Sequence, residues 1–299
     1  MSASNSVQPS SRGAARHADI GRLVLTCPDR AGIVAAVSTF LTRAGANIIS
    51  LDQHSTQPEG GTFLQRTVFH LPGLTAASPE LDREFAELAA RFDIDYRFTE
   101  AAKPKRVAIF ASTADHCLLD LLWRNRRGEL DMTVVMVIAN HPELAEQVRA
   151  FNVPFVYIPA TRDTRAEAEQ RQLELLRGNV DLVILARYMQ IVTPEFLDQI
   201  GCPLINIHHS FLPAFIGANT YRRARERGVK LIGATAHYVT ADLDEGPIIE
   251  QDVVRVDHTH AVEDLVRLGA DVERAVLSRA VLWHCQDRIL RHDNETVIF

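Results

Sequence analysis

Apolar runs alternate with amphipathic stretches through the last two-thirds of the chain. Short apolar runs rich in β-branched residues occupy residues 106–111, 133–139, 155–159 and 182–186. Helical stretches begin between them, near residues 116, 142 and 164, and a long final helix is expected over residues 262–291. Two more apolar runs cover residues 204–208 and 232–239. This alternation predicts an α/β domain with a doubly wound, mostly parallel sheet over residues 106–299.

The pattern differs between residues 21 and 100. A strand at residues 23–27 precedes a helix whose apolar stripe includes Ile33, Val37 and Leu41, and Gly45 ends that helix. Two strands joined at residues 58–61 form a hairpin, and a helix over residues 79–92 and a last strand at 93–98 follow. The order βαββαβ predicts a small ferredoxin-like α+β domain, with residues 101–105 as its linker to the next domain.

Composition narrows the class of protein. The chain has 299 residues, 46% of them hydrophobic, which is enough for two domains with real cores. Its net charge of −6 argues against nucleic-acid binding, which needs clustered cations. No secretory segment or membrane-length apolar run is present, and the four cysteines form no Cys-x-x-Cys pair, so we expect a cytoplasmic protein. Residues 1–20 are too polar to build a core and are expected to be disordered.

Candidate chemistry begins at the end of the apolar run 204–208. Side chains two apart on a strand share a face, so Asn206 and His208 project together, beyond the strand end where ligands bind in open α/β sheets. Asp244 lies in an acidic, glycine-terminated loop after the next apolar run. An amide and an imidazole can stabilise an oxyanion and move a proton, and a carboxylate can orient and charge the imidazole. A lone Asn-x-His motif is more often just a capped strand end.

Joined to their neighbours, these residues resemble a known family. The runs Asn206-Ile207-His208-His209-Ser210-Phe211-Leu212-Pro213 and Asp244-Glu245-Gly246-Pro247 are similar to the signature of the folate-dependent formyltransferase fold. Within it, residues 208–218 and 244–252 resemble the formyltetrahydrofolate deformylases. The resemblance covers nearly everything after residue 20.

This resemblance implies a hydrolase acting on a linear amide. Such an enzyme uses water to convert 10-formyltetrahydrofolate to formate and tetrahydrofolate, which supplies formate for purine biosynthesis and balances the one-carbon pool. It needs no metal or other cofactor. The implied catalytic set is Asn206, His208 and Asp244. The folate substrate is expected to bind, largely through backbone groups, at Arg187, Tyr188, Met189, Gln190, Ile191, Val192, Gly217 and His237. For His237, a supporting role and a core histidine satisfied by backbone are nearly equal alternatives.

The N-terminal domain resembles an ACT domain at Cys27-Pro28-Asp29-Arg30-Ala31-Gly32-Ile33. ACT domains often pair with a copy of themselves and bind an amino acid at the joint. The resemblance implies a homo-oligomer with an effector such as glycine or methionine, bound near Asp29, Arg30, Gly32 and Asn47. A domain used only for subunit assembly is the alternative.

Three competing functions are weaker. A glycinamide ribonucleotide formyltransferase would hold phosphate in a Gly-Ser-Asn-rich turn, whereas residues 111–115 read Ala-Ser-Thr-Ala-Asp. A methionyl-tRNA formyltransferase would need a further RNA-binding domain, and a ligand sensor would not need all three catalytic residue types. His258 and His260 could chelate a metal but lack a nearby third ligand. The deformylase pattern continues after Gly217-Ala218 with a basic residue, Pro, Tyr, His and Gln, whereas this chain has Asn219-Thr220-Tyr221-Arg222-Arg223. Because this loop is expected beside the strand of Asn206 and His208, the loss of the Pro and the shift of positive charge bear on substrate affinity.

Overall fold

The computed structural model describes residues 17–57, 59–161, 163–214 and 220–299. The chain divides into two compact units. The first contains the N-terminal residues through Pro104 together with Gln286–His292 and Val297–Phe299, and the second contains Lys105–Cys285 and Asp293–Thr296. The C-terminal residues are therefore shared between the two units.

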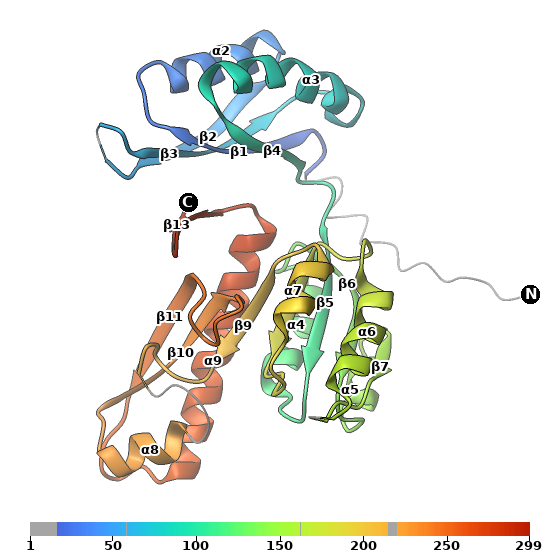
Figure 1. Ribbon diagram of the computed structural model, residues 1–299, viewed down its shortest axis with the longest axis vertical. Coiled ribbons are helices and arrows are strands. Elements are labelled where there is room, and N and C mark those ends of the chain that lie inside the picture. The colour runs from blue at the N-terminus through green and yellow to red at the C-terminus, as the bar shows by residue number, and fades with distance from the viewer. Residues whose placement is uncertain (1–16, 58, 162, 215–219) are drawn as a thin grey trace, which may run out of the picture. The chain divides into compact units, whose positions relative to one another are not determined.

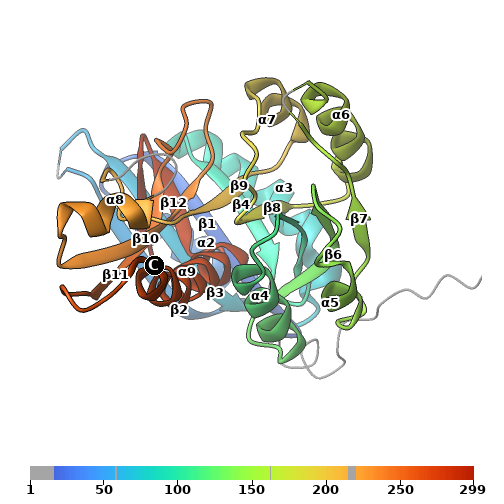
Figure 2. The same ribbon diagram turned by 90° about the horizontal axis from the view of Figure 1, so that it is seen from below.

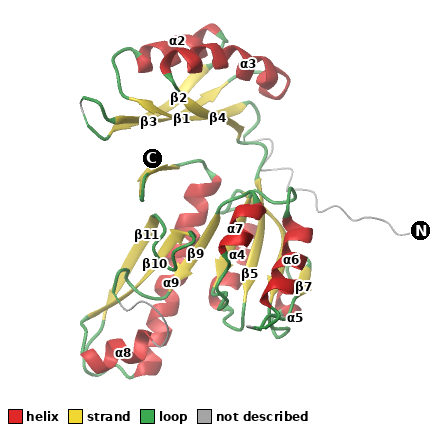
Figure 3. Cartoon of the chain, in the orientation of Figure 1, coloured by secondary structure: helices red, strands yellow, loops and turns green. Residues whose placement is uncertain are grey.

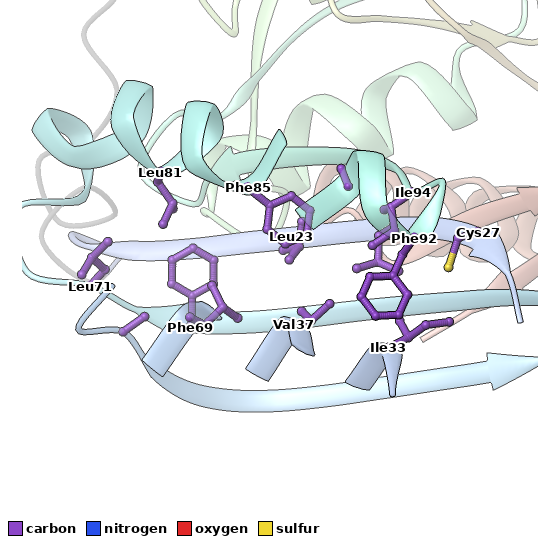
Figure 4. Close-up of a cluster of buried hydrophobic side chains, with 14 of the residues drawn as sticks. Leu23, Cys27, Ile33, Val37, Phe69, Leu71, Leu81, Phe85, Phe92 and Ile94 are labelled. Atoms are coloured by element: carbon purple, nitrogen blue, oxygen red, sulfur yellow. The ribbon is translucent and has the colours of Figure 1, made fainter. Parts of the chain in front are cut away.

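The first unit is an antiparallel sheet covered by two helices. Its elements are β1 (Ile20–Pro28), α2 (Ile33–Arg43), β2 (Asn47–Ser55), β3 (Thr62–His70), α3 (Leu74–Phe92) and β4 (Asp95–Glu100). The strand order is β2-β3-β1-β4, and α2 and α3 lie on one face (Figure 1). Alternate residues of β1, such as Leu23 and Cys27, meet Val37, Phe69 and Phe85 in the core under these helices (Figure 4). The predicted βαββαβ order is confirmed.

The C-terminal tail packs on the opposite face of this sheet. The final helix, α9 (Val262–Cys285), ends six residues before the predicted position, and two short strands follow, β12 (Ile289–His292) and β13 (Glu295–Ile298). Leu290 of the tail is buried against Val24 and Leu64, whose side chains alternate with those of the helix-covered core. Because these outward-facing apolar residues of β1 and β3 need cover, the tail completes a second small core.

The second unit is a seven-stranded sheet with helices on both faces. Its strands are β5 (Lys105–Ala111), β6 (Met132–Ala139), β7 (Phe155–Tyr157), β8 (Leu182–Ala186), β9 (Leu204–His208), β10 (Leu231–Tyr238) and β11 (Ile248–Arg255). Its helices are α4 (His116–Arg126), α5 (Ala145–Arg149), α6 (Arg165–Leu176), α7 (Pro194–Ile200), α8 (Thr220–Arg227) and α9. Helices α6 and α7 cover one face of the sheet, and α4, α5 and α9 lie on the other (Figure 2).

The strand order β11-β10-β9-β8-β5-β6-β7 combines a parallel part with an antiparallel edge (Figure 3). Strands β5 to β9 are parallel, and β10 and β11 are antiparallel additions beside β9. The mostly parallel sheet is confirmed. Because β10 runs against β9, the loop after β10 has to fold back to bring Asp244 to the carboxyl end of β9.

Candidate active site

Strand β9 places the first two candidate residues side by side. Asn206 and His208 are two positions apart in the strand and line one cavity of about 290 Å³ at its carboxyl end. His208 is buried, and no hydrogen-bond partner is found for its Nε2 among the described residues. Hydrogen bonds from the Leu212 amide to the Thr235 hydroxyl, and from that hydroxyl to the Ser210 carbonyl, hold the segment after His208 against β10. The predicted pair therefore sits in the wall of this cavity, with one imidazole nitrogen buried and unpaired among the described residues.

Asp244 reaches the same cavity from the loop after β10. Its backbone has φ of 59°, a left-handed conformation that Asp and Asn adopt more readily than most residues. Gly246 lets the loop fold back, since a Cβ there would lie 1.8 Å from the carbonyl oxygen of Tyr238. The Asp244 Oδ2 atom is 3.2 Å from His208 Nδ1. Burial raises the pKa of the Asp244 carboxyl, but its contacts with His208 and His237 lower it by more, so the pKa stays below its usual range and the group is ionised.

His237 joins this group through the pairing of β9 with β10. It lies opposite Asn206 in the antiparallel register, and residues directly opposite on paired strands share a face. Its Nε2 is 3.2 Å from Asn206 Nδ2 and 3.7 Å from Asp244 Oδ1. Its Nδ1 is 2.9 Å from the carbonyl oxygen of Tyr238, which can only accept, so Nδ1 carries a proton. Both features expected for His237 are present. The residue lies beside Asn206 and Asp244, and its Nδ1 is hydrogen-bonded to the backbone.

The expected folate loop lines the cavity. The lining includes Arg187, Tyr188, Met189, Gln190, Ile191 and Val192, together with Val239, Thr240, Ala241 and Leu243 from the loop after β10. The loop is fixed at both ends: the Met189 amide donates to the Ser112 hydroxyl at 2.9 Å, and the Thr193 amide donates to Glu169 at 2.9 Å. Met189 and Ile191 expose their apolar side chains. Gly217, the remaining residue of this prediction, lies outside the described residues.

Three of the four expected effector residues line a separate cavity in the first unit. Asp29, Arg30 and Gly32 border a space of about 540 Å³ beside the start of α2, with Ser38 and Gln53. Arg30 is held by a hydrogen bond to the Arg91 carbonyl oxygen. Asn47, the fourth residue, begins β2 and is not among the residues that line this cavity.

The sequence does not predict a buried charged cluster that lies beside the cavity of the candidate residues. Glu273 of α9 is 1% exposed and contacts His116, Arg187 and Tyr221. Among the described residues, His116, Cys117 and Glu273 are the only group whose donor atoms, within 4.8 Å of one another, match a set of three metal ligands. A glutamate on a long charged helix carries no local signal of burial, so only the fold reveals this cluster.

Comparisons with known proteins agree with this arrangement. Residues 105–281 match the family model for formyl transferase, and residues 21–82 match that for the ACT domain. A formyltetrahydrofolate deformylase of Mycobacterium tuberculosis is 80% identical over 283 residues, covering 94% of this chain and 91% of the relative.

Two solved structures have a similar fold. The structure of a formyltetrahydrofolate deformylase from Pseudomonas syringae superposes on this chain with a TM-score of 0.89 at 45% identity, covering 94% of each chain. That of glycinamide ribonucleotide transformylase 1 from Symbiobacterium toebii gives 0.63 at 32% identity, covering 68% of this chain and 96% of its own. Within the described residues, no helix combines the length and apolar character needed to cross a membrane.

Proposed function

We propose that Asn206, His208 and Asp244 carry out the hydrolysis in this chain, which belongs to the formyltetrahydrofolate deformylase family. The hydrolase activity is that of the family. The observation that supports this most directly is the 3.2 Å contact between His208 Nδ1 and the ionised Asp244, beside Asn206 in one cavity. Because the carboxylate accepts from Nδ1–H, Nε2 is the nitrogen that faces the substrate. The cavity then contains a proton carrier and an amide donor at neighbouring positions.

The proton path follows from these assignments. Asp244 has a lowered pKa and is therefore a weak base, so His208 Nε2 is the better acceptor for the proton of the attacking water. The water oxygen bonds to the formyl carbon, and an Asn206 N–H donates to the oxyanion that forms. The imidazolium returns its proton to N10 of the folate as the carbon–nitrogen bond breaks. Tetrahydrofolate and formate leave, and one proton passes to solvent.

His237 has a supporting role in this proposal. Its Nδ1–H is donated to the Tyr238 carbonyl oxygen, and its Nε2 accepts one N–H of Asn206. That contact sets the direction of the Asn206 amide and leaves its second N–H for the formyl oxygen. His237 is therefore a positioning residue for the oxyanion donor.

The pterin is proposed to bind against the loop from Arg187 to Val192. Fixed backbone groups of this loop and the exposed apolar side chains of Met189, Ile191 and Leu243 suit a flat heterocycle with polar edges. We further propose that the first unit, residues 21–100 with the C-terminal tail packed on its sheet, regulates the hydrolase formed by the second unit, of which Lys105–Cys285 is the main part. The enzyme would act in the cytoplasm as a homo-oligomer and supply formate for purine biosynthesis.

The proposed effector site is the cavity bordered by Asp29, Arg30 and Gly32. A carboxylate and a guanidinium beside a helix start suit the two charged ends of an amino acid such as glycine or methionine. Hydrolysis removes a one-carbon unit, and the levels of these two amino acids report on the one-carbon pool.

The test of the catalytic proposal is an assay of the pure full-length protein with 10-formyltetrahydrofolate and no amine. Formate and tetrahydrofolate are expected to appear in equal amounts. Asn206→Ala should slow turnover by about a hundredfold or more, as loss of an oxyanion donor does. Normal turnover in this variant would remove Asn206 from the proposed catalytic set.

A further inference from the structure

Glu273 is the centre of a cluster of polar groups that the hydrolysis scheme does not use. Its carboxylate accepts a hydrogen bond from the Tyr221 hydroxyl at 2.6 Å and lies 2.8 Å from His116 Nε2 and 3.4 Å from Arg187 Nε. Burial raises the pKa of Glu273, but the contacts with His116, Arg187 and Tyr221 lower it by more, so the net shift is downward. The carboxylate is therefore ionised at neutral pH although it is fully buried.

Helix α9 is shaped to admit this cluster. Gly269 lies one turn before Glu273, on the same face of the helix. A Cβ at Gly269 would lie 1.9 Å from the Tyr221 hydroxyl oxygen, so any other residue would displace the ring from Glu273. Residues from α4, α8, α9 and the end of β8 thus converge on one carboxylate.

Arg187 connects the cluster to the catalytic cavity. It follows β8 directly and lines the cavity that His208 and Asp244 also line. Its backbone has φ of 61°, which is uncommon for a residue with a Cβ and directs the chain away from a regular strand exit. Its Nε forms an ion pair with Glu273 at 3.4 Å without hydrogen-bond geometry, and its Nη1, also buried, has no hydrogen-bond partner among the described residues. His209 also borders the cavity, and burial together with Arg187 lowers its pKa to about 4.

The side of the cavity toward α9 is therefore made of a fixed guanidinium and a neutral imidazole. An amine acceptor reacts in its unprotonated form, so it would have to fit beside this wall, and the guanidinium also repels the protonated form in which most aliphatic amines are present at neutral pH. Water is smaller and carries no charge. A bound cation among His116, Cys117 and Glu273 is disfavoured by the same guanidinium, because it lies 3.4 Å from the carboxylate that would bind the cation.

We propose that Arg187, held in place by Glu273, is the specificity-determining residue that restricts the formyl acceptor to water. The inference rests on the proposed catalytic set at His208 and Asp244. With the wall intact, the formyl carbon forms a bond only to a water oxygen, and formate leaves. With the wall removed, an amine nitrogen takes the place of water: a carbon–nitrogen bond to the amine forms, the bond to N10 breaks, and the amine proton passes through His208 to N10.

The experiment replaces Arg187 by glycine and measures which products form. Glycine removes the side chain and also adopts the positive φ without strain. The full-length protein is incubated with 10-formyltetrahydrofolate and hydroxylamine, methoxyamine or glycinamide, and formate and the N-formyl products are quantified by mass spectrometry. The unmodified protein should give formate alone with methoxyamine and glycinamide, and Arg187→Gly should form an N-formyl product with both. With hydroxylamine, Arg187→Gly should raise the ratio of N-formyl product to formate about tenfold to two-hundredfold, the range of discrimination expected from a close-fitting pocket wall.

Two further variants keep the test decisive. Glu273→Gln leaves the shape but removes the charge that holds Arg187, so it should shift the product ratio in the same direction. Asn152→Gly is the matched control, because Asn152 has φ of 60° and is exposed in the turn between α5 and β7. It should leave the ratio unchanged.

Three outcomes would overturn the inference. The first is unmodified protein that formylates glycinamide. The second is Arg187→Gly that hydrolyses its substrate and forms no N-formyl product with any of the three amines. The third is an inactive Arg187→Gly together with an unchanged product ratio in Glu273→Gln. Absence of formate from the unmodified protein would instead contradict the proposed catalytic function.

Discussion

Replacement of Asp244 by asparagine tests the contact between His208 and Asp244 with little disturbance of the backbone. Asparagine has nearly the same shape and, like aspartate, tolerates the left-handed conformation found at this position. The change removes only the negative charge beside His208 Nδ1 and His237 Nε2. Folding and folate binding should therefore be preserved.

The expected loss of rate follows from the geometry. The Asp244 side chain is 8% exposed, so its 3.2 Å contact with the imidazole is poorly screened by solvent. A hydrogen bond between charged groups contributes about 1.5 to 3 kcal/mol. If that contribution is present fully in the transition state, its loss slows turnover roughly ten- to two-hundredfold at 1.36 kcal/mol per decade. Loss of the correct imidazole tautomer in the asparagine variant raises the expected reduction to about a thousandfold or more.

The assay measures formate release as a function of 10-formyltetrahydrofolate concentration. We expect kcat to fall and KM to change little, because Asp244 acts through His208 and not on the bound pterin. Asp242→Asn on the same loop is the control: its side chain is exposed and it should retain full activity. A folded Asp244→Asn variant with turnover near that of the control would refute the placement of the carboxylate.

Three further predictions concern stability and regulation. Asp287→Asn should lower the free energy of unfolding in urea by about 3 kcal/mol, because this buried carboxylate accepts from two arginines and a threonine, and exposed Asp95→Asn should have little effect. The pKa of His209 is about 4 in the folded state and about 6.5 in the unfolded state, so the unfolded state binds a proton first as the pH falls. The free energy of unfolding therefore decreases by about 3 kcal/mol from pH 6.5 to pH 4. His209→Gln should lose that much less between pH 7 and pH 4 in urea unfolding, and equal losses in both proteins would contradict the assignment. Glycine or methionine should raise the melting temperature and change the hydrolysis rate of the full-length protein; Ser38→Leu, which fills the effector cavity, should abolish both effects, and exposed Thr39→Leu should not.

Strand β9, with Asn206 and His208 on one face, could be predicted because its information is local. Asn206 and His208 share a face through the two-residue period of a strand, and the apolar run before them marks a buried strand. The parallel core and the βαββαβ domain follow in the same way from alternating patterns. The position of His237 beside Asn206 could not be predicted in this way, because it depends on the register of β10 against β9. Periodicity alone does not give the direction of an edge strand, and a shift of one residue would turn His237 away from Asn206.

The end of the final helix could not be predicted from local pattern, because contacts distant in sequence determine it. Amphipathic spacing continues weakly past Cys285, so the pattern alone extends the helix to Arg291. The structure ends it where the tail can cover the outer face of the N-terminal sheet, with Leu290 buried and Asp287 paired to Arg22 and Arg97. These contacts span more than 180 positions in the sequence, and burial of an apolar sheet face outweighs local helix propensity.

Glu273 shows where such non-local contacts bear on chemistry. On a 24-residue helix rich in charged residues, a glutamate is normally solvated, and only the approach of α4, α8 and the end of β8 makes it the anchor of Arg187. The resemblance to formyltransferases covers Asn206, His208 and Asp244, so these residues cannot by themselves separate a hydrolase from a transferase. The difference has to lie in which acceptor reaches the formyl carbon. In this chain that choice is proposed to depend on a helix face and a strand exit distant in sequence from the catalytic motif, which is why variants of Arg187 and Glu273, rather than of the catalytic set, should change the product.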